Sequence, residues 1–360
     1  METLKELVAL VRQTEPSRKV TVGQFPNRFG SVTRRDSAFM EAEPHPFQFY
    51  TDVVSTNYLE RFWDRDHIKY PQLVFLESEM AVGDLGYDYF NFDHNYPVGQ
   101  FYWGGTDYIG ESFGWPSKGW TRGLIDMTNE LKPLGWSVRS FYTAEPMVKL
   151  VVRPSHGQGG IDWNELRMTW IPLETHWNYT DSDSLKVQVM SNCPETELFL
   201  NGKSLGRKVL PPANKAPELV WDVPYHKGTL IACGYRNGQT IASDTLQTSG
   251  APHRLIIDCD ADTLHADGLD LAYLNCRVVD KNGQIANTDV TIHFSVSGPG
   301  TIAGVCNDDM LSNEPWQASQ RTTSHGRCQL IVRSSCQPGM VKVTARAKGL
   351  KTITTTIPVR

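Results

Sequence analysis

The chain has 360 residues, enough for two or three domains, and its 40% hydrophobic and 21% charged residues are ordinary for a globular protein. A formal net charge of -5 and an isoelectric point near 6.1 provide no basic surface, so nucleic acid is not expected as a partner. No run approaches the ~18 apolar residues of a membrane-spanning helix, and the first residues lack the pattern of a signal peptide.

The seven cysteines all follow residue 190, and none is spaced as in the C-x-x-C pairs of zinc sites. An odd and scattered set of this kind favours buried free thiols over a disulfide framework. We therefore expect no disulfide scaffold, no metal and no cofactor.

The first 150 residues alternate helical and strand-like stretches. The spacing of Leu4, Leu7, Val8 and Val11 predicts a helix over residues 2 to 13, and Pro16 ends it before a strand begins. Further strands are predicted at 51 to 58, 71 to 79 and 98 to 105, a short helix at 59 to 67, and a last element at 134 to 143. Such alternation favours parallel βα units. The four strands are half the number in a closed eight-stranded barrel.

Two glutamates follow the apolar run Leu73 to Leu76 in "LVFLESEMAVG". The run fits a parallel strand with both faces covered, where a charge is costly unless it is paired or lies at the strand's end. Glu77 and Glu79 would share a face if the strand continued, but only Glu77 directly closes the run. In a (β/α) barrel, the carboxyl end of a strand is where catalytic groups lie.

After about residue 170 the pattern changes to short alternating strands separated by turns, which is typical of β-sandwiches. Asn201-Gly202 and Asn237-Gly238 lie between apolar strands and predict tight hairpins. A second all-β stretch begins near Pro252, and "QTSGAPH" at 247 to 253 is the expected linker. We predict three domains, at residues 1–150, 151–249 and 250–360.

These motifs, taken in order, resemble a known family. "TDVVSTNY", "YPQLVFLESE", "VGQFYWGGTDYIGES" and "LGWSVRSFYT" are similar to the second half of the catalytic barrel of glycoside hydrolase family 2, of the β-galactosidase type found in gut Bacteroidetes. "VQVMSNCPETELFLNGKSLG" resembles the sandwich that follows this barrel, and "GPGTIAGVCNDD" an immunoglobulin-like C-terminal module. The resemblance implies a multidomain fold, with part of a (β/α)8 (TIM) barrel followed by two immunoglobulin-like β-sandwiches.

The resemblance also implies site residues. The family's nucleophile closes the seventh barrel strand, which matches Glu77, and Glu79 is then a loop carboxylate near the substrate. Tyr58, with Asn57 beside it, matches the tyrosine that donates a hydrogen bond to the nucleophile. A retaining glycosidase attacks the anomeric carbon with such a carboxylate while a second carboxyl protonates the leaving group.

Further along, Trp103 matches the tryptophan that forms the floor under the sugar ring. Asp107 and Glu111 follow that strand as candidates for substrate contact, although loop carboxylates are more often solvated or in ion pairs. Trp115, Trp120 and Trp136 are interpreted as packing residues.

The sequence departs from the family in two ways. Met80 stands where β-galactosidases carry a histidine, so the resemblance does not fix which sugar the protein would select. The acid/base glutamate should precede residue 1, and no Asn-Glu pair here replaces it, so this chain alone is expected to be inactive without an N-terminal portion of the same enzyme. The expected partner is an oligosaccharide or β-glycoside, and the resemblance suggests a periplasmic or secreted protein. The alternative is a non-catalytic carbohydrate-binding or adhesion module built on the two sandwiches.

Overall fold

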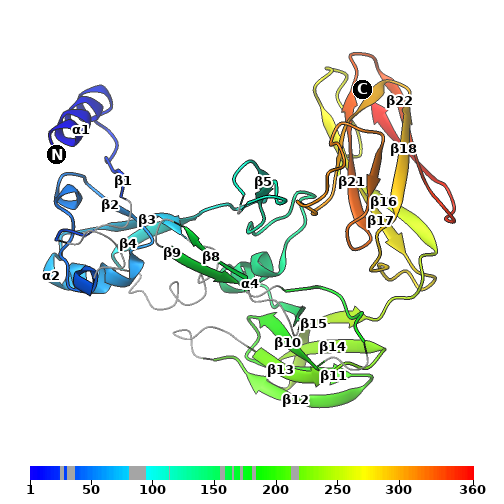
Figure 1. Ribbon diagram of the computed structural model, residues 1–360, viewed down its shortest axis with the longest axis horizontal. Helices are drawn as coiled ribbons and strands as arrows, with labels where there is room; N and C mark the ends of the chain where they lie inside the picture. Colours follow the sequence, from blue (N-terminus) through cyan, green and yellow to red (C-terminus); the bar gives the residue numbers. More distant parts are fainter. Residues whose placement is uncertain are drawn as a thin grey trace.

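The computed structural model describes residues 1–24, 28–30, 37–80, 95–112, 114–154, 159–163, 166–170, 173–180, 184–211 and 219–360, with only the backbone at 159–163 and 166–170. Its first part holds the helices α1 and α2 and the strands β1 to β4, and two all-β parts follow (Figure 1). The N-terminus and the C-terminus lie at opposite ends of the molecule (Figure 1). Within the described residues, no helix has the length and apolar character needed to cross a membrane.

The first part is a parallel sheet in the order β1-β2-β3-β4. The predicted parallel arrangement of these four strands is therefore confirmed, although the strand expected after Pro16 is only two residues long. In chain order the elements are α1 (Glu2–Thr14), β1 (Gly23–Gln24), η1 (Ser37–Met40), η2 (Pro46–Phe49), β2 (Val54–Asn57), η3 (Glu60–Phe62), α2 (Trp63–Lys69), β3 (Phe75–Met80) and β4 (Pro97–Tyr102).

The helix α2 covers one face of this sheet. Its Trp63 packs with Val54 of β2 and Phe75 of β3 in a small apolar core. Along residues 73 to 78, buried and half-buried side chains alternate, so Phe75 faces α2 while Leu76 lies on the other face. In this part of β3, the buried side chains therefore lie on the face toward α2 and the half-buried ones on the opposite face.

A buried ion pair fastens the segment before η1 to α2. Arg28 donates from Nη1 and Nη2 to the two carboxylate oxygens of Asp66, at 2.9 and 2.8 Å, and its Nε donates to the Ala42 carbonyl at 2.8 Å. The exposed fractions of the two side chains are only 1% and 3%. The Arg28 guanidinium also lies 4.2 Å from the centre of the Phe62 ring. Pairing in this fork geometry offsets the cost of removing both charges from water.

A connecting segment follows β4 and contacts the C-terminal part. It contains the hairpin of β5 (Tyr108–Ile109) and β6 (Gly119–Trp120) and then α4 (Pro133–Tyr142). The Lys118 N–H donates to the Met310 carbonyl at 3.1 Å, and the Gln329 side chain donates to the Thr128 carbonyl at 3.0 Å. The connecting segment and the third part are therefore joined by direct hydrogen bonds.

The second part consists of two sheets around one apolar core, in which Trp177 is fully buried. Both predicted Asn-Gly hairpins are confirmed, since Asn201 and Asn237 take the positive φ angles that such turns need. The sheets have the orders β13-β10-β7 and β12-β11-β14-β15. Their strands are β7 (Val148–Arg153), β10 (Ser184–Ser191), β11 (Glu195–Leu200), β12 (Lys203–Val209), β13 (Leu219–Pro224), β14 (Thr229–Arg236) and β15 (Gln239–Gln247), and β8 (Gly159–Trp163) pairs separately with β9 (Leu166–Trp170).

The third part has the same plan, with the sheets β16-β17-β21-β19 and β20-β18-β22-β23 packed around a second core. All seven cysteines are free thiols. The prediction of buried thiols is correct for four of them and wrong for the exposed Cys336. The strands are β16 (Arg254–Cys259), β17 (Leu271–Val279), β18 (Thr291–Ser297), β19 (Gly300–Cys306), β20 (Gln320–Thr322), β21 (Arg327–Ser334), β22 (Gly339–Ala347) and β23 (Ile353–Val359).

Candidate functional site at the strand ends

Glu77 is completely buried and faces the helical layer. Its Oε1 accepts a hydrogen bond from the Tyr58 backbone N–H at 2.5 Å, and its Oε2 accepts one from the Thr56 hydroxyl at 3.3 Å. Thr56 is in turn bound by the Trp63 indole of α2. The prediction that Glu77 is the reacting carboxylate is therefore not supported, because this side chain has no surface that a substrate could reach.

The charge state of Glu77 agrees with a structural position. Burial raises its pKa well above the usual range, and the nearby charge of Glu60 raises it further, against lowering hydrogen bonds from Tyr58 and Thr56. Removal from water disfavours the charged form of a carboxyl group. A carboxyl group with a raised pKa ionises less readily and is less suited to act as a nucleophile, which favours a structural role for Glu77.

A β-bulge separates Glu77 from Glu79. Thr56 pairs with Glu77, but the next residue, Asn57, pairs with Glu79, so Ser78 is an extra residue in β3. The alternation of buried and half-buried side chains breaks at this point, because Ser78 and Glu79 are both half-buried. The expectation that the two glutamates share a face is therefore wrong, and Glu79 is the one that solvent reaches.

Tyr58 and Asn57, at the end of β2, both bind Glu79. The Tyr58 hydroxyl donates to Glu79 Oε1, and the Asn57 side-chain amide donates to Oε2 at 2.7 Å. Asn57 is itself oriented by the Ser78 hydroxyl, which donates to its Oδ1 at 2.8 Å. The predicted hydrogen bond from the Tyr58 hydroxyl to Glu77 is wrong, since this hydroxyl donates to Glu79 and the backbone N–H of Tyr58 donates to Glu77.

The backbone of Tyr58 has a φ of 60°, which is uncommon for a non-glycine residue. This left-handed turn lets one residue contact both glutamates, with its N–H on Glu77 and its hydroxyl on Glu79. Burial raises the pKa of Tyr58, and the hydrogen bond and charge of Glu79 raise it further, so the phenol keeps its proton. Backbone strain of this kind is concentrated at functional sites.

Residues after β4 surround the same point. The Trp103 N–H donates to the Met80 carbonyl at 3.0 Å, which extends the sheet, and the exposed fraction of Trp103 is 38%. Burial, the hydrogen bond to Glu111 and the charges of Glu111 and Glu79 raise the pKa of Tyr108 to about 12. The structure therefore brings Asn57, Tyr58, Trp103 and Glu79 to one edge of the sheet, with Tyr108 and Glu111 beside them.

Asp107 is placed differently from the prediction. Its carboxylate oxygens accept from Lys132 Nζ at 3.0 and 2.8 Å, and the Gly123 N–H donates to Oδ1 at 2.7 Å. Burial raises the pKa of Asp107 although the charge of Lys132 lowers it. The predicted substrate contact is not supported, because this buried carboxylate is occupied in attaching β5 to the segment before α4.

Glu79 thus combines access with a fixed orientation. A carboxylate has about four acceptor positions, and Tyr58 and Asn57 use one on each oxygen. Within the part of the chain that the structure describes, the remaining lone pairs are available to attack an electrophilic carbon or to accept a proton. Among the described residues, no group of three or more His, Cys, Asp or Glu side chains is arranged to hold a metal ion.

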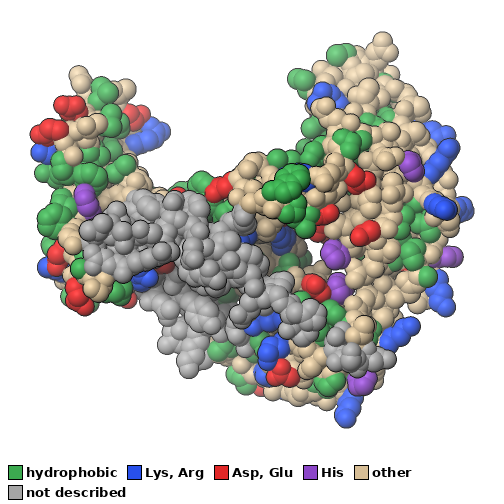
Figure 2. Space-filling model, viewed as in Figure 1, with side chains coloured by type: hydrophobic (Ala, Val, Ile, Leu, Met, Phe, Trp, Pro, Cys, Tyr) green, Lys and Arg blue, Asp and Glu red, His purple; other side chains and the backbone are tan. Residues whose placement is uncertain are grey.

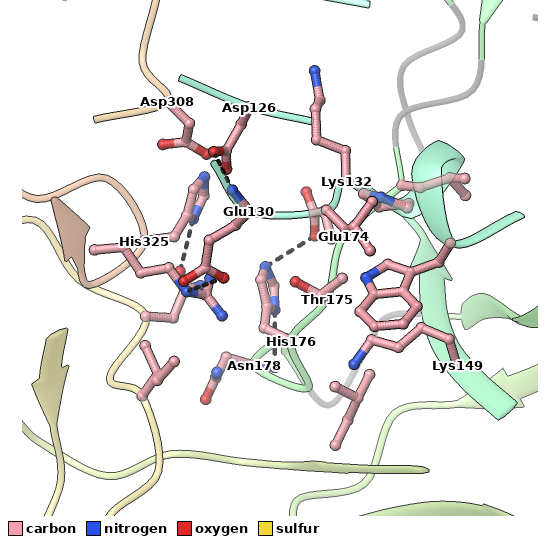
Figure 3. A pocket seen from close by; sticks show the side chains of 18 of the residues that line it. Asp126, Glu130, Lys132, Lys149, Glu174, Thr175, His176, Asn178, Asp308 and His325 are labelled. Atoms are coloured by element: carbon pink, nitrogen blue, oxygen red, sulfur yellow. Dashed lines mark hydrogen bonds and ion pairs between the residues drawn. The ribbon is translucent and has the colours of Figure 1, made fainter. Parts of the chain in front are cut away.

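A cavity of about 450 Å³ lies where the connecting segment meets both all-β parts (Figure 3). Figure 3 shows His176 pointing at Glu174, with Nε2 to Oε2 at 3.0 Å, and that hydrogen bond lowers the pKa of Glu174. Glu130 pairs with Arg277 at 2.9 Å, and Lys149 with Asp244 at 3.1 Å. The Glu130–Arg277 pair therefore joins the connecting segment to the third part, whereas the other two pairs lie within the second part. None of the described lining residues belongs to the strand-end site.

Comparison with known families matches the two all-β parts. Residues 255–356 match the family described as "Glycoside hydrolase family 2 C-terminal domain 5". Residues 182–242 match a domain of unknown function, DUF4982. Both matches lie downstream of the strand-end site.

Individual relatives extend the similarity over the first part. The solved structure of a glycosyl hydrolase family 2 member from Bacteroides cellulosilyticus is 29% identical, with a TM-score of 0.87, over 100% of this chain and 47% of its own. The β-galactosidase BoGH2A of Bacteroides ovatus is 29% identical over 72% of this chain and 28% of its own length. A β-glucuronidase of Formosa agariphila is 27% identical over 53% of this chain and 20% of its own. The chain thus spans less than half the length of each.

Proposed function

This chain corresponds to the C-terminal region of glycoside hydrolase family 2 proteins, and on that basis we propose that it forms part of a retaining β-glycosidase with Glu79 as the nucleophile. The observation that carries the proposal is the pair of hydrogen bonds from Tyr58 and Asn57 that hold a solvent-reachable Glu79 at the end of β3. Glu77, the candidate from the sequence, acts instead as a buried support for the Tyr58 turn.

In this mechanism an oxygen of Glu79 attacks the anomeric carbon while the bond to the leaving oxygen breaks. The leaving oxygen takes its proton from a second carboxyl group, which in retaining enzymes lies roughly 5 to 5.5 Å from the nucleophile. Water then breaks the glycosyl ester, and the second carboxyl group, now ionised, takes a proton from that water. Glu130 does not fill this place, because it is bound to Arg277 at the cavity.

We propose that the parallel sheet is the second half of a (β/α)8 barrel and that the third part is an immunoglobulin-like sandwich. The sheet supports this because strands β1 and β4 lie at its edges, and Val98 and Phe101 of β4 are 63% and 62% exposed. Further strands would cover these apolar side chains. The acid/base carboxyl group then belongs to that other half, and the described sheet alone is not expected to turn over substrate.

The proposed substrate is a β-galactoside or a related β-glycoside. Support comes from the similarity to the β-galactosidase BoGH2A. The similarity to a β-glucuronidase makes a β-glucuronide the alternative substrate. Trp103 would provide a flat apolar surface under the sugar ring.

The test is to assay the complete gene product on nitrophenyl β-galactoside, β-glucoside and β-glucuronide and to follow the anomeric configuration of the first product by NMR. We expect hydrolysis of at least one substrate with retention of configuration. Hydrolysis with inversion would contradict the nucleophilic role of Glu79. Sugar binding without any hydrolysis would instead favour the non-catalytic carbohydrate-binding module.

Replacement of Tyr58 by phenylalanine is expected to lower kcat/KM by about 100-fold, because one oriented hydrogen bond to Glu79 is lost. The matched control is Tyr235→Phe, which removes a hydroxyl from β14 in the second part. Steady-state kinetics on the same nitrophenyl glycoside compare the two variants. Equal rates for both would show that the Tyr58 hydroxyl does not act on the reacting carboxylate.

A further inference from the structure

Trp115 lies at the tip of the hairpin between β5 and β6, and its exposed fraction is 77%. The Gly110 N–H donates to the Lys118 carbonyl at 2.9 Å, and the Ser117 N–H donates to the Gly114 carbonyl at 3.1 Å, which closes the turn around Trp115. The interpretation of Trp115 as a packing residue is therefore wrong. The structure presents this indole to solvent instead of to a core.

The hairpin tip is anchored to the third part of the chain. Lys118 donates from its backbone N–H to the Met310 carbonyl and from Nζ to the Leu311 carbonyl, each at 3.1 Å. The same Nζ lies 5.3 Å from the centre of the Trp115 ring, and Leu311 is 57% exposed. Figure 2 shows hydrophobic side chains on the surface in this part of the molecule. An indole whose backbone is already fixed loses little conformational entropy when it binds a ligand.

The base of this hairpin borders the strand-end site. Tyr108 of β5 donates to Glu111 at 2.5 Å, and the charge of Glu79 acts on the Tyr108 phenol. The charge of Glu111 likewise acts on Tyr58. Trp115 follows Glu111 by four residues, so it lies at most about 14 Å further along the chain. Trp115 therefore lies within about 14 Å of Glu111, which itself borders the strand-end site.

We propose, given the glycosidase function proposed above, that Trp115 and Leu311 bind a distal sugar ring of the same saccharide chain that Glu79 attacks. The apolar C–H face of a pyranose stacks on an indole, and an exposed aromatic surface next to a site is a common means of holding a ligand. The substrate class is then a β-linked oligosaccharide rather than a glycoside of a single sugar. Trp115 is a residue that determines specificity for chain length.

The test is calorimetric binding in a Glu79→Gln background, which prevents turnover during the titration. The probes are β-linked galacto- and gluco-oligosaccharides of one to six units. We expect affinity to rise with length, and Trp115→Ala to weaken binding of the longer saccharides about tenfold while the monosaccharide is unaffected. Trp115→Phe, which keeps an aromatic face, should retain most of the affinity.

Leu269→Ala is the matched control, because Leu269 is also 77% exposed but lies in the third part away from the hairpin sequence. Affinity that does not depend on length, or an equal effect of the alanine variants at positions 115 and 269, would overturn the proposal. A change in oligomeric state on Trp115→Ala would also overturn it and assign the patch to protein association. Hydrolysis of nitrophenyl glycosides by the complete gene product tests the glycosidase function separately, because those substrates carry a single sugar.

Discussion

In the complete gene product, glutamine in place of Glu79 is expected to reduce kcat on a nitrophenyl glycoside by at least ~10³-fold, because an amide cannot form the glycosyl ester. The fold should be unaffected, since glutamine is isosteric and its carbonyl oxygen can still accept from Tyr58 or Asn57. Stopped assays on the purified variant measure the rate, and circular dichroism verifies the fold. Turnover within tenfold of the unmodified protein would contradict the assignment.

Glu77→Gln is the control two residues away, and it should keep most of the activity because the glutamine oxygen still accepts from the Tyr58 N–H. The two variants should also differ in their dependence on pH. The raised folded-state pKa of Glu77 gives stability that is fully present below the ordinary carboxyl pKa of about 4.3 and is lost as pH rises through the folded-state pKa. Glutamine does not ionise, so the unfolding free energy of Glu77→Gln, measured by denaturation at a series of pH values, should lack this loss.

Loss of the buried pair between Arg28 and Asp66 is expected to cost about 3 to 5 kcal/mol of unfolding free energy in the first part of the chain. Asp66→Asn removes the carboxylate charge that pairs with the enclosed Arg28 guanidinium, and the hydrogen bond to the Ala42 carbonyl at 2.8 Å and the contact with the Phe62 ring do not replace that charge. Differential scanning calorimetry should show the earliest transition moving to lower temperature. The transitions of the two all-β parts should stay in place.

Asp222→Asn is the matched substitution at an exposed pair. Asp222 lies 2.7 Å from Lys186, and the exposed fractions of the two side chains are 74% and 56%. Exposed pairs contribute about 0 to 1 kcal/mol, so this variant should shift no transition appreciably. Similar shifts of the unfolding transitions in the two variants would show that burial does not increase the contribution of the Arg28–Asp66 pair to stability.

Most of the local structure follows from the sequence pattern. The spacing of apolar residues predicts α1, the apolar run that ends at Leu76 predicts β3, and the Asn-Gly pairs at 201 and 237 predict the hairpins of the second part. These signals depend only on neighbouring residues. The periodicity of apolar residues and the turn preference of Asn-Gly therefore suffice to predict these elements.

The choice between the two glutamates could not be predicted in this way. A β-bulge at Ser78 changes which face Glu79 occupies, and nothing in "LESEM" marks it, because a bulge depends on the pairing of β3 with β2. The predicted roles of Asp107 and Trp115 are also wrong because the surroundings of both residues depend on partners that are distant in the sequence. Lys132 lies 25 residues from Asp107, and the anchors of the Trp115 hairpin lie on residues 310 and 311.

Covalent trapping tests the central assignment most directly. An activated 2-fluoro glycoside of the preferred sugar should accumulate as a glycosyl-enzyme, because the fluorine slows its hydrolysis. Both glutamates lie on one peptide, so fragment-ion sequencing must separate position 77 from position 79. We expect the sugar on Glu79, with labelling unchanged in Glu77→Gln and absent in Glu79→Gln. A label on Glu77, or labelling that persists in Glu79→Gln, would contradict this assignment.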